Sequence, residues 1–339
     1  MVAGINNPQV SAWLAAHVTD STPPFTFTLI AGGHSNLTYR CTDAAGRHLV
    51  LRRPPLGQVL QSAHDVGREH RLMAALAGSG VPVPCVHGLC TDATVNDGPF
   101  MLMAYVEGVV LHDAAAAALA PPADRRALSE HVIDVLAALH RVDPNAVGLG
   151  DLGRHDGYVA RQIKRWTQQW EATRTDPLPA MDAASRLLTA GIPAQLGTAI
   201  VHGDYRLGNL LVADGRVQAV LDWELCTLGD ALADLGYLLN HWADVGEAAI
   251  GISEQLPTSI GGFMSRADML ARYAAQSGRD VSQIDYYRAL ALWRTAAIRQ
   301  GVYRRYVGGA MAGQPRVGLE EMRLSVAHCA EAALELLGR

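Results

Sequence analysis

Lysine is almost absent from this 339-residue chain, since Lys164 is the single lysine and every other permanently cationic side chain is an arginine. No lysine is therefore available for a catalytic role in the first half of the chain. Cysteines are few and odd in number, and none forms the C-x-x-C pair typical of zinc and redox sites. We expect reduced, mostly buried thiols, as in a cytosolic protein. The cysteines are Cys41, Cys85, Cys90, Cys226 and Cys329.

Long apolar runs and a strong bias of charge are also missing. No stretch of about 18 apolar residues runs without a charge, so we expect no membrane span. The N-terminus lacks the basic and then apolar pattern of a secretory signal. The net charge of -5 and the pI near 6.2 give no reason to expect nucleic acid or an anionic membrane as a partner. A globular cytoplasmic protein is the expected class.

Hydrophobic periodicity divides the chain into two parts. The first part predicts a short helix at residues 8–17, a longer helix at 62–77, and strands at 25–30, 37–42, 48–52, 85–90 and 99–106. The second part is helical almost throughout, with strands expected only around Val201 and at 217–221. Its expected helices cover residues 123–141, 157–172, 180–190, 231–242, 266–276, 284–306 and 319–337.

This order of elements predicts an α+β protein with two lobes. Residues 1–106 form a small N-terminal lobe with an antiparallel sheet and one main helix. Residues 107–339 form a larger, mainly helical C-terminal lobe.

Two polar motifs, each beside an apolar strand-like run, carry the most chemistry. Residues 202–209 read HGDYRLGN, and Asp222 follows thirteen residues later. Asp204 can orient an attacking hydroxyl and accept its proton, and Arg206 can neutralise charge on the group being transferred. Asn209 and Asp222 offer the hard oxygen ligands that Mg²⁺ prefers. The pattern predicts phosphoryl transfer, although residues of these types also cap turns without any catalytic role.

The two motifs resemble the catalytic and metal-binding segments of the protein-kinase-like superfamily, in its aminoglycoside and small-molecule phosphotransferase branch. The resemblance implies a bilobal kinase-like fold, with ATP and Mg²⁺ as cofactors. It also implies that Asp204 is the base, that Arg206 is the catalytic-loop cation, and that Asn209 and Asp222 hold the metal.

A glycine-containing loop lies between the first two expected strands, where the resemblance implies contacts with phosphates. Gly33, Ser35 and Asn36 belong to this loop, and glycine lets a backbone approach phosphate closely. The loop lacks the G-x-G-x-x-G pattern of protein kinases, so a hairpin loop without a ligand is the alternative.

Residues 103–108 match the segment that links the two lobes in this family. The resemblance implies that backbone groups of Tyr105 or Val106 bond the edge of the adenine and that Met103 lines the back of its pocket. The alternative is that these side chains only belong to an apolar core.

Arg52 is a departure from the family, which keeps a lysine there that pairs nucleotide phosphates with a glutamate on the following helix. Glu69 is the natural partner, although a solvated helix carboxylate is the alternative reading of this residue. A guanidinium is always charged and holds phosphate or carboxylate with two bonds, so the electrostatic role survives the change. Because Arg52 replaces this lysine, an alternative function stays open: a catalytically weak pseudokinase that binds a nucleotide or an acyl-CoA.

Further residues near the motifs favour structural roles. Asp234 is expected to hold the catalytic loop by accepting backbone hydrogen bonds, and His202 to anchor the same loop. Asp230 is a plausible cap for the next helix. A metal-dependent hydrolase built on His202, Asp204 and Asp222 lacks the additional ligands that such sites need.

Residues 147–170 and 222–230 look like the kinase-like domain that is fused to certain acyl-CoA dehydrogenases in animals, and like its free-standing bacterial relatives. This resemblance implies a small-molecule hydroxyl acceptor of the hydroxyacyl-CoA type. An aminoglycoside-type or other small-molecule kinase is the alternative.

The charge of the segment after residue 150 offers a separate test of the acceptor. An apolar helical stripe is expected at Val159, Ile163, Trp166 and Trp170. An excess of basic residues, off this stripe and at the segment's ends, would suit the phosphates of a CoA ester better than a polycationic antibiotic. An arginine-rich solvated face is the alternative. The basic residues are Arg154, Arg161, Lys164, Arg165 and Arg174.

Overall fold

The computed structural model describes residues 2–31, 36–56, 65–247, 255–309 and 317–338. The chain forms two compact units, of which the first contains Met1–Gly108 and Gln218–Leu225, and the second Val109–Val217 and Cys226–Arg339. Strand β9, Arg216–Val220, runs from the second unit into the first. Asp222 therefore belongs to the same unit as Arg52. The division into functional domains after residue 106 stays a prediction.

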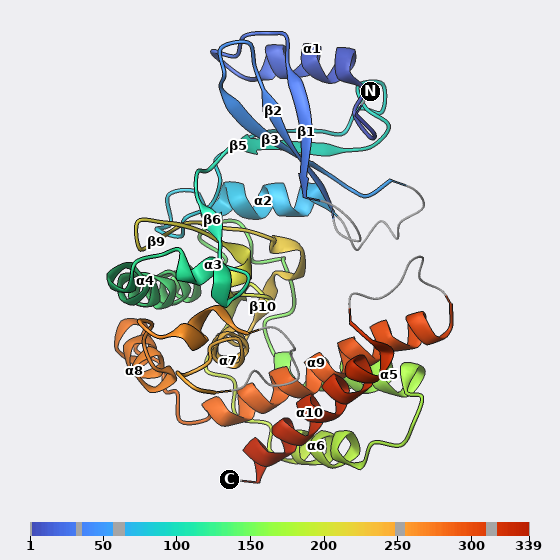
Figure 1. Cartoon of the computed structure of the whole chain (residues 1–339), viewed down its shortest axis with the longest axis vertical. Coiled ribbons are helices and arrows are strands. Elements are labelled where there is room, and N and C mark those ends of the chain that lie inside the picture. Colours follow the sequence, from blue (N-terminus) through green and yellow to red (C-terminus); the bar gives the residue numbers. More distant parts are fainter. Residues whose placement is uncertain (1, 32–35, 57–64, 248–254, 310–316, 339) are drawn as a thin grey trace. The chain divides into compact units, whose positions relative to one another are not determined.

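A five-stranded antiparallel sheet of order β1-β2-β3-β5-β4 forms the centre of the first unit (Figure 1). The observed strands agree closely with those expected from alternation. They are β1 Thr26–Ala31, β2 Leu37–Thr42, β3 His48–Arg53, β4 Val86–Cys90 and β5 Phe100–Ala104.

Helices α1, Asn7–His17, and α2, Val66–Leu76, cover opposite faces of this sheet (Figure 1). Leu49 and Leu51 of β3 share a core cluster with residues of α1. Because strand side chains alternate between faces, Arg52 points to the face that α2 covers. The first turn of α2 carries Glu69, and the side chain of Asp65 caps its N-terminus.

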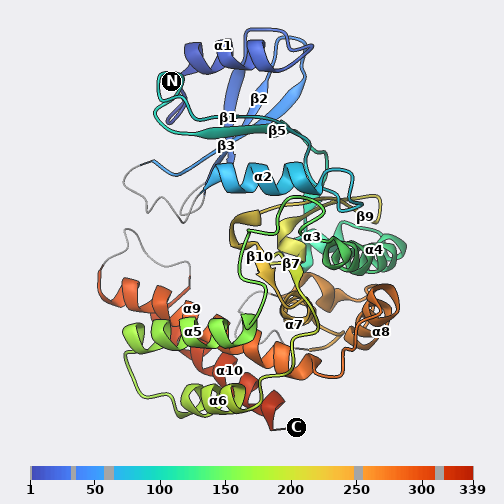
Figure 2. The same cartoon turned by 180° about the vertical axis from the view of Figure 1, so that it is seen from behind.

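The second unit is mainly helical, with α9 as its central helix in contact with α5, α7 and α10 (Figure 2). The expected helices are present, and none of the described helices has both the length and the apolar composition needed to cross a bilayer. The helices are α3 Ala114–Ala118, α4 Pro122–Arg141, α5 Tyr158–Thr173, α6 Pro179–Ala190, α7 Leu232–Asn240, α8 Arg266–Ser277, α9 Ile284–Val307 and α10 Leu319–Leu337.

Short strands in this half exceed the two that periodicity predicts, because runs of two to four residues carry too little alternation. Strand β7, Ala199–Val201, pairs with β10, Thr227–Gly229, and β6, Val109–Val110, pairs with β8, Leu210–Ala213. The prediction of only two strands was therefore wrong, and the short helix α3 was also missed. The 3-10 turns are Leu207–Asn209, Trp223–Leu225 and Pro257–Ile260.

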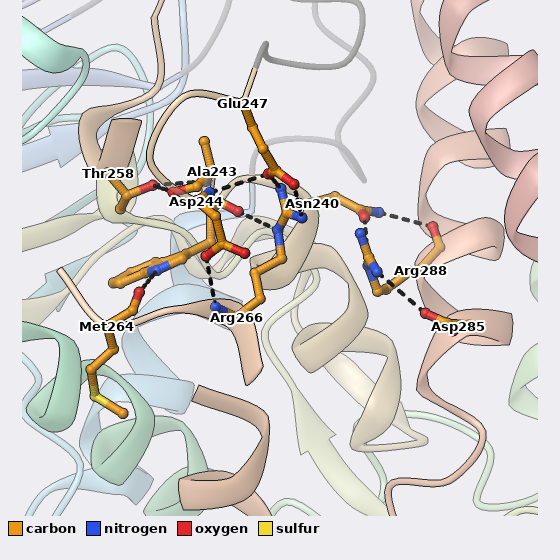
Figure 3. A network of polar contacts seen from close by, with 10 residues as sticks. Asn240, Ala243, Asp244, Glu247, Thr258, Met264, Arg266, Asp285 and Arg288 are labelled. Carbon is orange, nitrogen blue, oxygen red and sulfur yellow. Dashed lines mark hydrogen bonds and ion pairs between the residues drawn. The ribbon is translucent and has the colours of Figure 1, made fainter. Parts of the chain in front are cut away.

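A polar network fixes the segment that follows α7 (Figure 3). The amide nitrogen of Asn240, at the end of α7, donates to the carbonyl of Arg288 on α9 across 2.8 Å. The side chain of Arg266, at the start of α8, donates to the carbonyl of Trp242. Its backbone N–H donates to Asp244 across 2.9 Å. These bonds tie α7 to α8 and α9, which gives the residues on α7 a rigid support.

Candidate active site

The predicted site residues fall into two groups, one in each unit. In the first unit, the guanidinium of Arg52 joins two carboxylates. Its Nε lies 3.0 Å from Oε2 of Glu69, and its Nη2 lies 2.8 Å from Oδ1 of Asp222. The predicted pairing of Arg52 with Glu69 is therefore confirmed, and the solvated-carboxylate alternative is wrong because the Glu69 side chain is only 3% exposed.

Glu69 has a second partner in Asn36, whose amide nitrogen donates to Oε1 across 2.6 Å. Burial raises the pKa of Glu69 above its ordinary value, although the charge of Arg52 opposes this effect. Asn36 thus supports Glu69, while its contact with a phosphate stays a prediction. Gly33 and Ser35 lie outside the described residues.

Asp222 has a backbone φ of 65°, in the left-handed region that few residues other than glycine adopt. Asp and Asn tolerate this conformation better than other side chains do, because their short polar groups can bond locally. The sharp turn after β9 directs the Asp222 carboxylate toward Arg52, where its side chain keeps 29% exposure. The local backbone therefore favours Asp at this position independently of any ligand.

The expected adenine-contacting residues lie at the end of β5 and in the irregular segment after it. Met103 is buried on β5 and pairs with Val50 on β3. Tyr105 is half-buried and its ring stands edge-on to His48, with 5.5 Å between the ring centroids. Val106 is also half-buried. Their contact with adenine stays a prediction.

In the second unit, Asp204 is the centre of a hydrogen-bond cluster. Its Oδ1 accepts a hydrogen bond from the hydroxyl of Tyr237 and lies 3.3 Å from Nε of Arg206. Its Oδ2 accepts a bond from Nδ2 of Asn209 across 2.6 Å. The three predicted residues of the HGDYRLGN motif are thus in direct contact with one another.

The amide of Asn209 has a defined orientation, because Nδ2 also donates to the carbonyl oxygen of Asp204 across 2.9 Å. A carbonyl oxygen can only accept, so the NH₂ end of the amide must face Asp204. The oxygen end, Oδ1, consequently points away from the carboxylate and is the end that can bind a cation.

A buried carboxylate fixes the backbone of the HGDYRLGN loop. Asp234 accepts hydrogen bonds from the backbone N–H groups of His202, across 2.6 Å, and Gly203, across 2.8 Å. Burial opposes ionisation of Asp234, but hydrogen bonds and the adjacent His140 hold its pKa below the ordinary value. The predicted structural role of Asp234 is confirmed.

His202 is fully buried, and its Nδ1 accepts the backbone N–H of Asp204 across 3.2 Å, as expected of an anchor of the loop. Asp230 accepts the backbone N–H of Leu232, the first residue of α7, across 3.1 Å. Ala231 itself has helical backbone angles and no capping side chain, so the predicted role of Asp230 as the cap of α7 is confirmed.

Arg206 folds back over the loop, and glycine at position 208 leaves room for it. A Cβ placed on Gly208 would lie 2.1 Å from Nη1 of Arg206. The guanidinium can therefore stay beside Asp204 while its side chain remains about one-third exposed. From this partly exposed position, the Arg206 guanidinium can contact a negatively charged group of a ligand that enters from solvent.

Tyr237 and Arg294 lie at the same centre, although sequence patterns did not identify them. Nη2 of Arg294, on α9, donates to the carbonyl of Gly203 across 2.6 Å. Its guanidinium carbon lies 5.2 Å from the ring centroid of Tyr237. Tyr237 follows Asp234 by three positions on α7, which is a local signal for a shared helix face. The sequence around Arg294 gives no local signal that this residue contacts the loop.

The apolar stripe of α5 is present, with Val159, Ile163 and Trp170 buried and Trp166 half-buried. Arg161 is engaged, because it donates to the backbone carbonyls of Asp156 and Arg154. The exposed cations of this segment are Arg154, Lys164, Arg165 and Arg174.

Residues 26–260 match the model of the phosphotransferase enzyme family. A crystal structure of a candidate aminoglycoside phosphotransferase from Ralstonia eutropha is 33% identical, has a TM-score of 0.83 and covers 98% of both chains. Aminoglycoside phosphotransferase APH(4)-Ia, solved in ternary complex with AMP-PNP and hygromycin B, is 17% identical with a TM-score of 0.63, covering 97% of this chain and 98% of its own. The latter likeness shows a shared fold.

Among curated proteins, acyl-CoA dehydrogenase family member 10 of Mus musculus is 38% identical over 296 residues. These residues make up 86% of this chain but only 27% of the mouse protein. This chain thus spans about a quarter of that relative's length. The predicted α+β fold is confirmed as the kinase-like aminoglycoside phosphotransferase fold, with an antiparallel sheet in its N-terminal part. The chain belongs to the phosphotransferase enzyme family and is a small-molecule kinase.

Proposed function

We propose that this protein transfers the γ-phosphoryl group of ATP, in the presence of Mg²⁺, to the hydroxyl of a hydroxyacyl-CoA ester. The observation that carries the proposal is the contact of Asn209 Nδ2 with Asp204 Oδ2, at 2.6 Å. It joins a carboxylate that can accept a proton to an amide whose oxygen can bind a cation. Phosphoryl transfer needs both groups at one centre.

Each of the two proposed ligands suits a magnesium ion by its chemistry, because Asn209 Oδ1 and the Asp222 carboxylate are hard oxygen donors. A carboxylate and an amide oxygen leave room for nucleotide phosphates and water, which Mg²⁺ commonly keeps as ligands. When bound, the ion would neutralise negative charge on the phosphates. Asn209 and Asp222 would hold it, and the Arg52–Glu69 pair would position the nucleotide.

Asp204 acts as the proton acceptor in this proposal. The acceptor's oxygen forms a bond to the γ-phosphorus, the bond from that phosphorus to the β–γ bridging oxygen breaks, and the hydroxyl proton moves to Asp204. ADP leaves with the bridging oxygen. Arg206, beside the carboxylate, can stabilise charge on the phosphoryl group. The Asp234 anchor keeps the loop in place, so little reorganisation is needed during transfer.

Two observations support the choice of cofactor and acceptor. The structurally similar aminoglycoside phosphotransferase APH(4)-Ia was solved with AMP-PNP, an ATP analogue, which supports ATP as the donor. The similarity to an acyl-CoA dehydrogenase family member, together with the exposed cations Lys164 and Arg165 on α5, supports an anionic acyl-CoA acceptor.

Replacement of the base tests the reaction. Asp204→Asn should bind nucleotide like the wild type but should lose transfer by at least about 1,000-fold, since both the proton acceptor and its charge disappear. Asp214→Asn, in an exposed turn of the same unit, is the matched control. Turnover would be followed by ADP release in the presence of Mg²⁺-ATP and a hydroxyacyl-CoA. Undiminished turnover in Asp204→Asn would overturn the assigned mechanism.

A thermal-shift panel tests the acceptor class. With Mg²⁺-ATP present, a hydroxyacyl-CoA should raise the midpoint of unfolding more than free CoA or the matched acyl-CoA without the hydroxyl, because a bound ligand stabilises the folded state. Stabilisation by aminoglycosides alone would instead support the antibiotic-type alternative.

One contact favours a second candidate, a catalytically silent nucleotide- or acyl-CoA-binding protein. Arg52 occupies one oxygen of the proposed metal ligand Asp222 and replaces the family's lysine. Slow ATP hydrolysis that disappears in Asp204→Asn would exclude this candidate. Nucleotide binding with the same background hydrolysis in both proteins would support it.

A further inference from the structure

We propose that Tyr237 is a positioning residue for Asp204: its hydroxyl holds Oδ1 of the carboxylate and thereby leaves Oδ2 to receive the acceptor's proton. This inference rests on the proposed function, because it assumes that Asp204 is the base. It adds a residue on α7 to the reaction centre.

The hydrogen bonds of Asp204 distinguish its two oxygens. Oδ1 faces two donors, the hydroxyl of Tyr237 and Nε of Arg206 at 3.3 Å. Oδ2 faces one donor among the described residues, Nδ2 of Asn209 at 2.6 Å. Each carboxylate oxygen can accept about two hydrogen bonds. Oδ1 is therefore fully engaged, and Oδ2 keeps the capacity to accept one more.

The ring of Tyr237 is held on two sides. The guanidinium carbon of Arg294 lies 5.2 Å from its centroid, and the ring of His241 lies 4.3 Å away at a tilt of 39°. Arg294 also donates to the carbonyl of Gly203 in the catalytic loop. The tyrosine is thus fixed by the same helix α9 that contacts the loop, so its hydroxyl can act as a rigid restraint on Asp204.

Helix α7 approaches the loop with two residues on one face. Asp234 binds the backbone N–H groups of His202 and Gly203, and Tyr237, three positions later, binds the side chain of Asp204. One helix therefore fixes both the backbone and the carboxylate of the proposed base. Buried tyrosine hydroxyls elsewhere in this unit bind structural acceptors: Tyr286 donates to the carbonyl of Leu188 across 2.8 Å, and Tyr287 donates to Asp230 across 2.7 Å. Tyr237 differs from them because its acceptor is the proposed base.

The protonation of Tyr237 supports the role of a donor. Burial raises its pKa above the ordinary value, and the charge of Asp204 acts in the same direction. The phenol therefore keeps its proton throughout the neutral range and does not compete with Asp204 for the proton of the acceptor.

Tyr237→Phe tests the inference, because it removes the hydroxyl and keeps the ring between Arg294 and His241. A misplaced carboxylate should lower kcat by about 10- to 100-fold and change KM for ATP and acceptor by less than about 2-fold. Tyr286→Phe is the matched control, since it removes a buried hydroxyl from the same unit and should leave kcat unchanged. Unfolding midpoints of both variants would be measured alongside. An unchanged kcat in Tyr237→Phe would overturn the inference.

A double-mutant cycle separates this inference from the proposed function. In an Asp204→Asn background, Tyr237→Phe should cause no further loss of residual turnover, because its effect passes through the carboxylate. An equal loss in both backgrounds would show that Tyr237 acts by another route, and would overturn the positioning role. Full activity of Asp204→Asn itself would overturn the proposed base, and the positioning role with it.

Discussion

Arg52 and Asp222, 170 positions apart in the chain, form an ion pair in which Nη2 lies 2.8 Å from Oδ1. The same guanidinium holds Glu69, so one cation balances two carboxylates. The residue that departs from the family pattern is therefore also the one that connects a strand, a helix and the turn after β9. Replacing Arg52 therefore tests how much this ion-pair cluster stabilises the first unit.

Arg52→Met should lower the free energy of unfolding by about 3–5 kcal/mol, because it leaves the buried Glu69 carboxylate without its cation. Arg272→Met is the control: Arg272 binds Asp134 at the surface of the second unit, and its loss should cost no more than about 1 kcal/mol. Urea unfolding would measure both values. Equal losses would show that the Arg52 cluster contributes no more than a surface ion pair.

Asp222→Asn should fold like the wild type but bind Mg²⁺-nucleotide at least about 10-fold more weakly, since it keeps the tolerated backbone and loses the charge. Asp222→Ala should in addition lose about 1–2 kcal/mol of stability, because φ is 65° at this residue.

Asp214→Asn is the control for Asp222, as Asp214 also has a positive φ, of 50°, in an exposed turn. Titration calorimetry with Mg²⁺-ATP would give the affinities. Equal affinities of wild type and Asp222→Asn would contradict the assigned ligand.

Gly236→Ala should destabilise the protein by about 1–3 kcal/mol, because α7 and α9 pack through this glycine without space for a methyl group. A Cβ there would lie 2.7 Å from the backbone carbonyl carbon of Tyr287, which cannot move without shifting α9. Gly318→Ala, where nothing lies within 4 Å of the added Cβ, should stay within about 0.5 kcal/mol of the wild type. Thermal unfolding would compare the two variants. Similar unfolding midpoints would show that α7 and α9 can move apart to accommodate the methyl group at little cost in stability.

His241 should make the protein sensitive to acid. Burial lowers its pKa to about 4, and the cations Arg206 and Arg299 act in the same direction, against the carboxylate of Asp204 and a bond to the Tyr237 carbonyl. Between about pH 6.5 and 4 the unfolded chain binds a proton at this residue that the folded protein does not. Stability therefore rises with pH through this window, and about 2–3 kcal/mol should be lost between pH 7 and 4.5.

His241→Gln should remove most of this loss, because glutamine has no group that titrates in this window. Urea unfolding at several pH values would show the difference in slope. An acid profile of His241→Gln that matches the wild type would mean that other groups cause the loss.

The longer helices and strands of this protein were predictable from sequence because their signals are local. Alternation over six residues placed β2, and helical periodicity over nineteen residues placed α10. The short strands β6, β8 and β10 were missed, because a strand of two to four residues carries little alternation of its own. The three-residue strand β7 was predicted from its apolar run, Ala199–Val201. The HGDYRLGN spacing likewise indicated Asp204, Arg206 and Asn209, since these residues lie on one turn.

By itself, the sequence determined which elements form and which polar groups share a loop, because both depend on residues that are neighbours in the chain. Only the tertiary structure decided that Arg52 reaches Asp222, that Tyr237 and Arg206 bind the same oxygen of Asp204, and that Arg294 reaches the carbonyl of Gly203. Apart from the local contact of Arg206 with Asp204, these contacts join residues 33 to 170 positions apart. They depend on how elements pack, which the periodicity of side chains in the sequence does not specify.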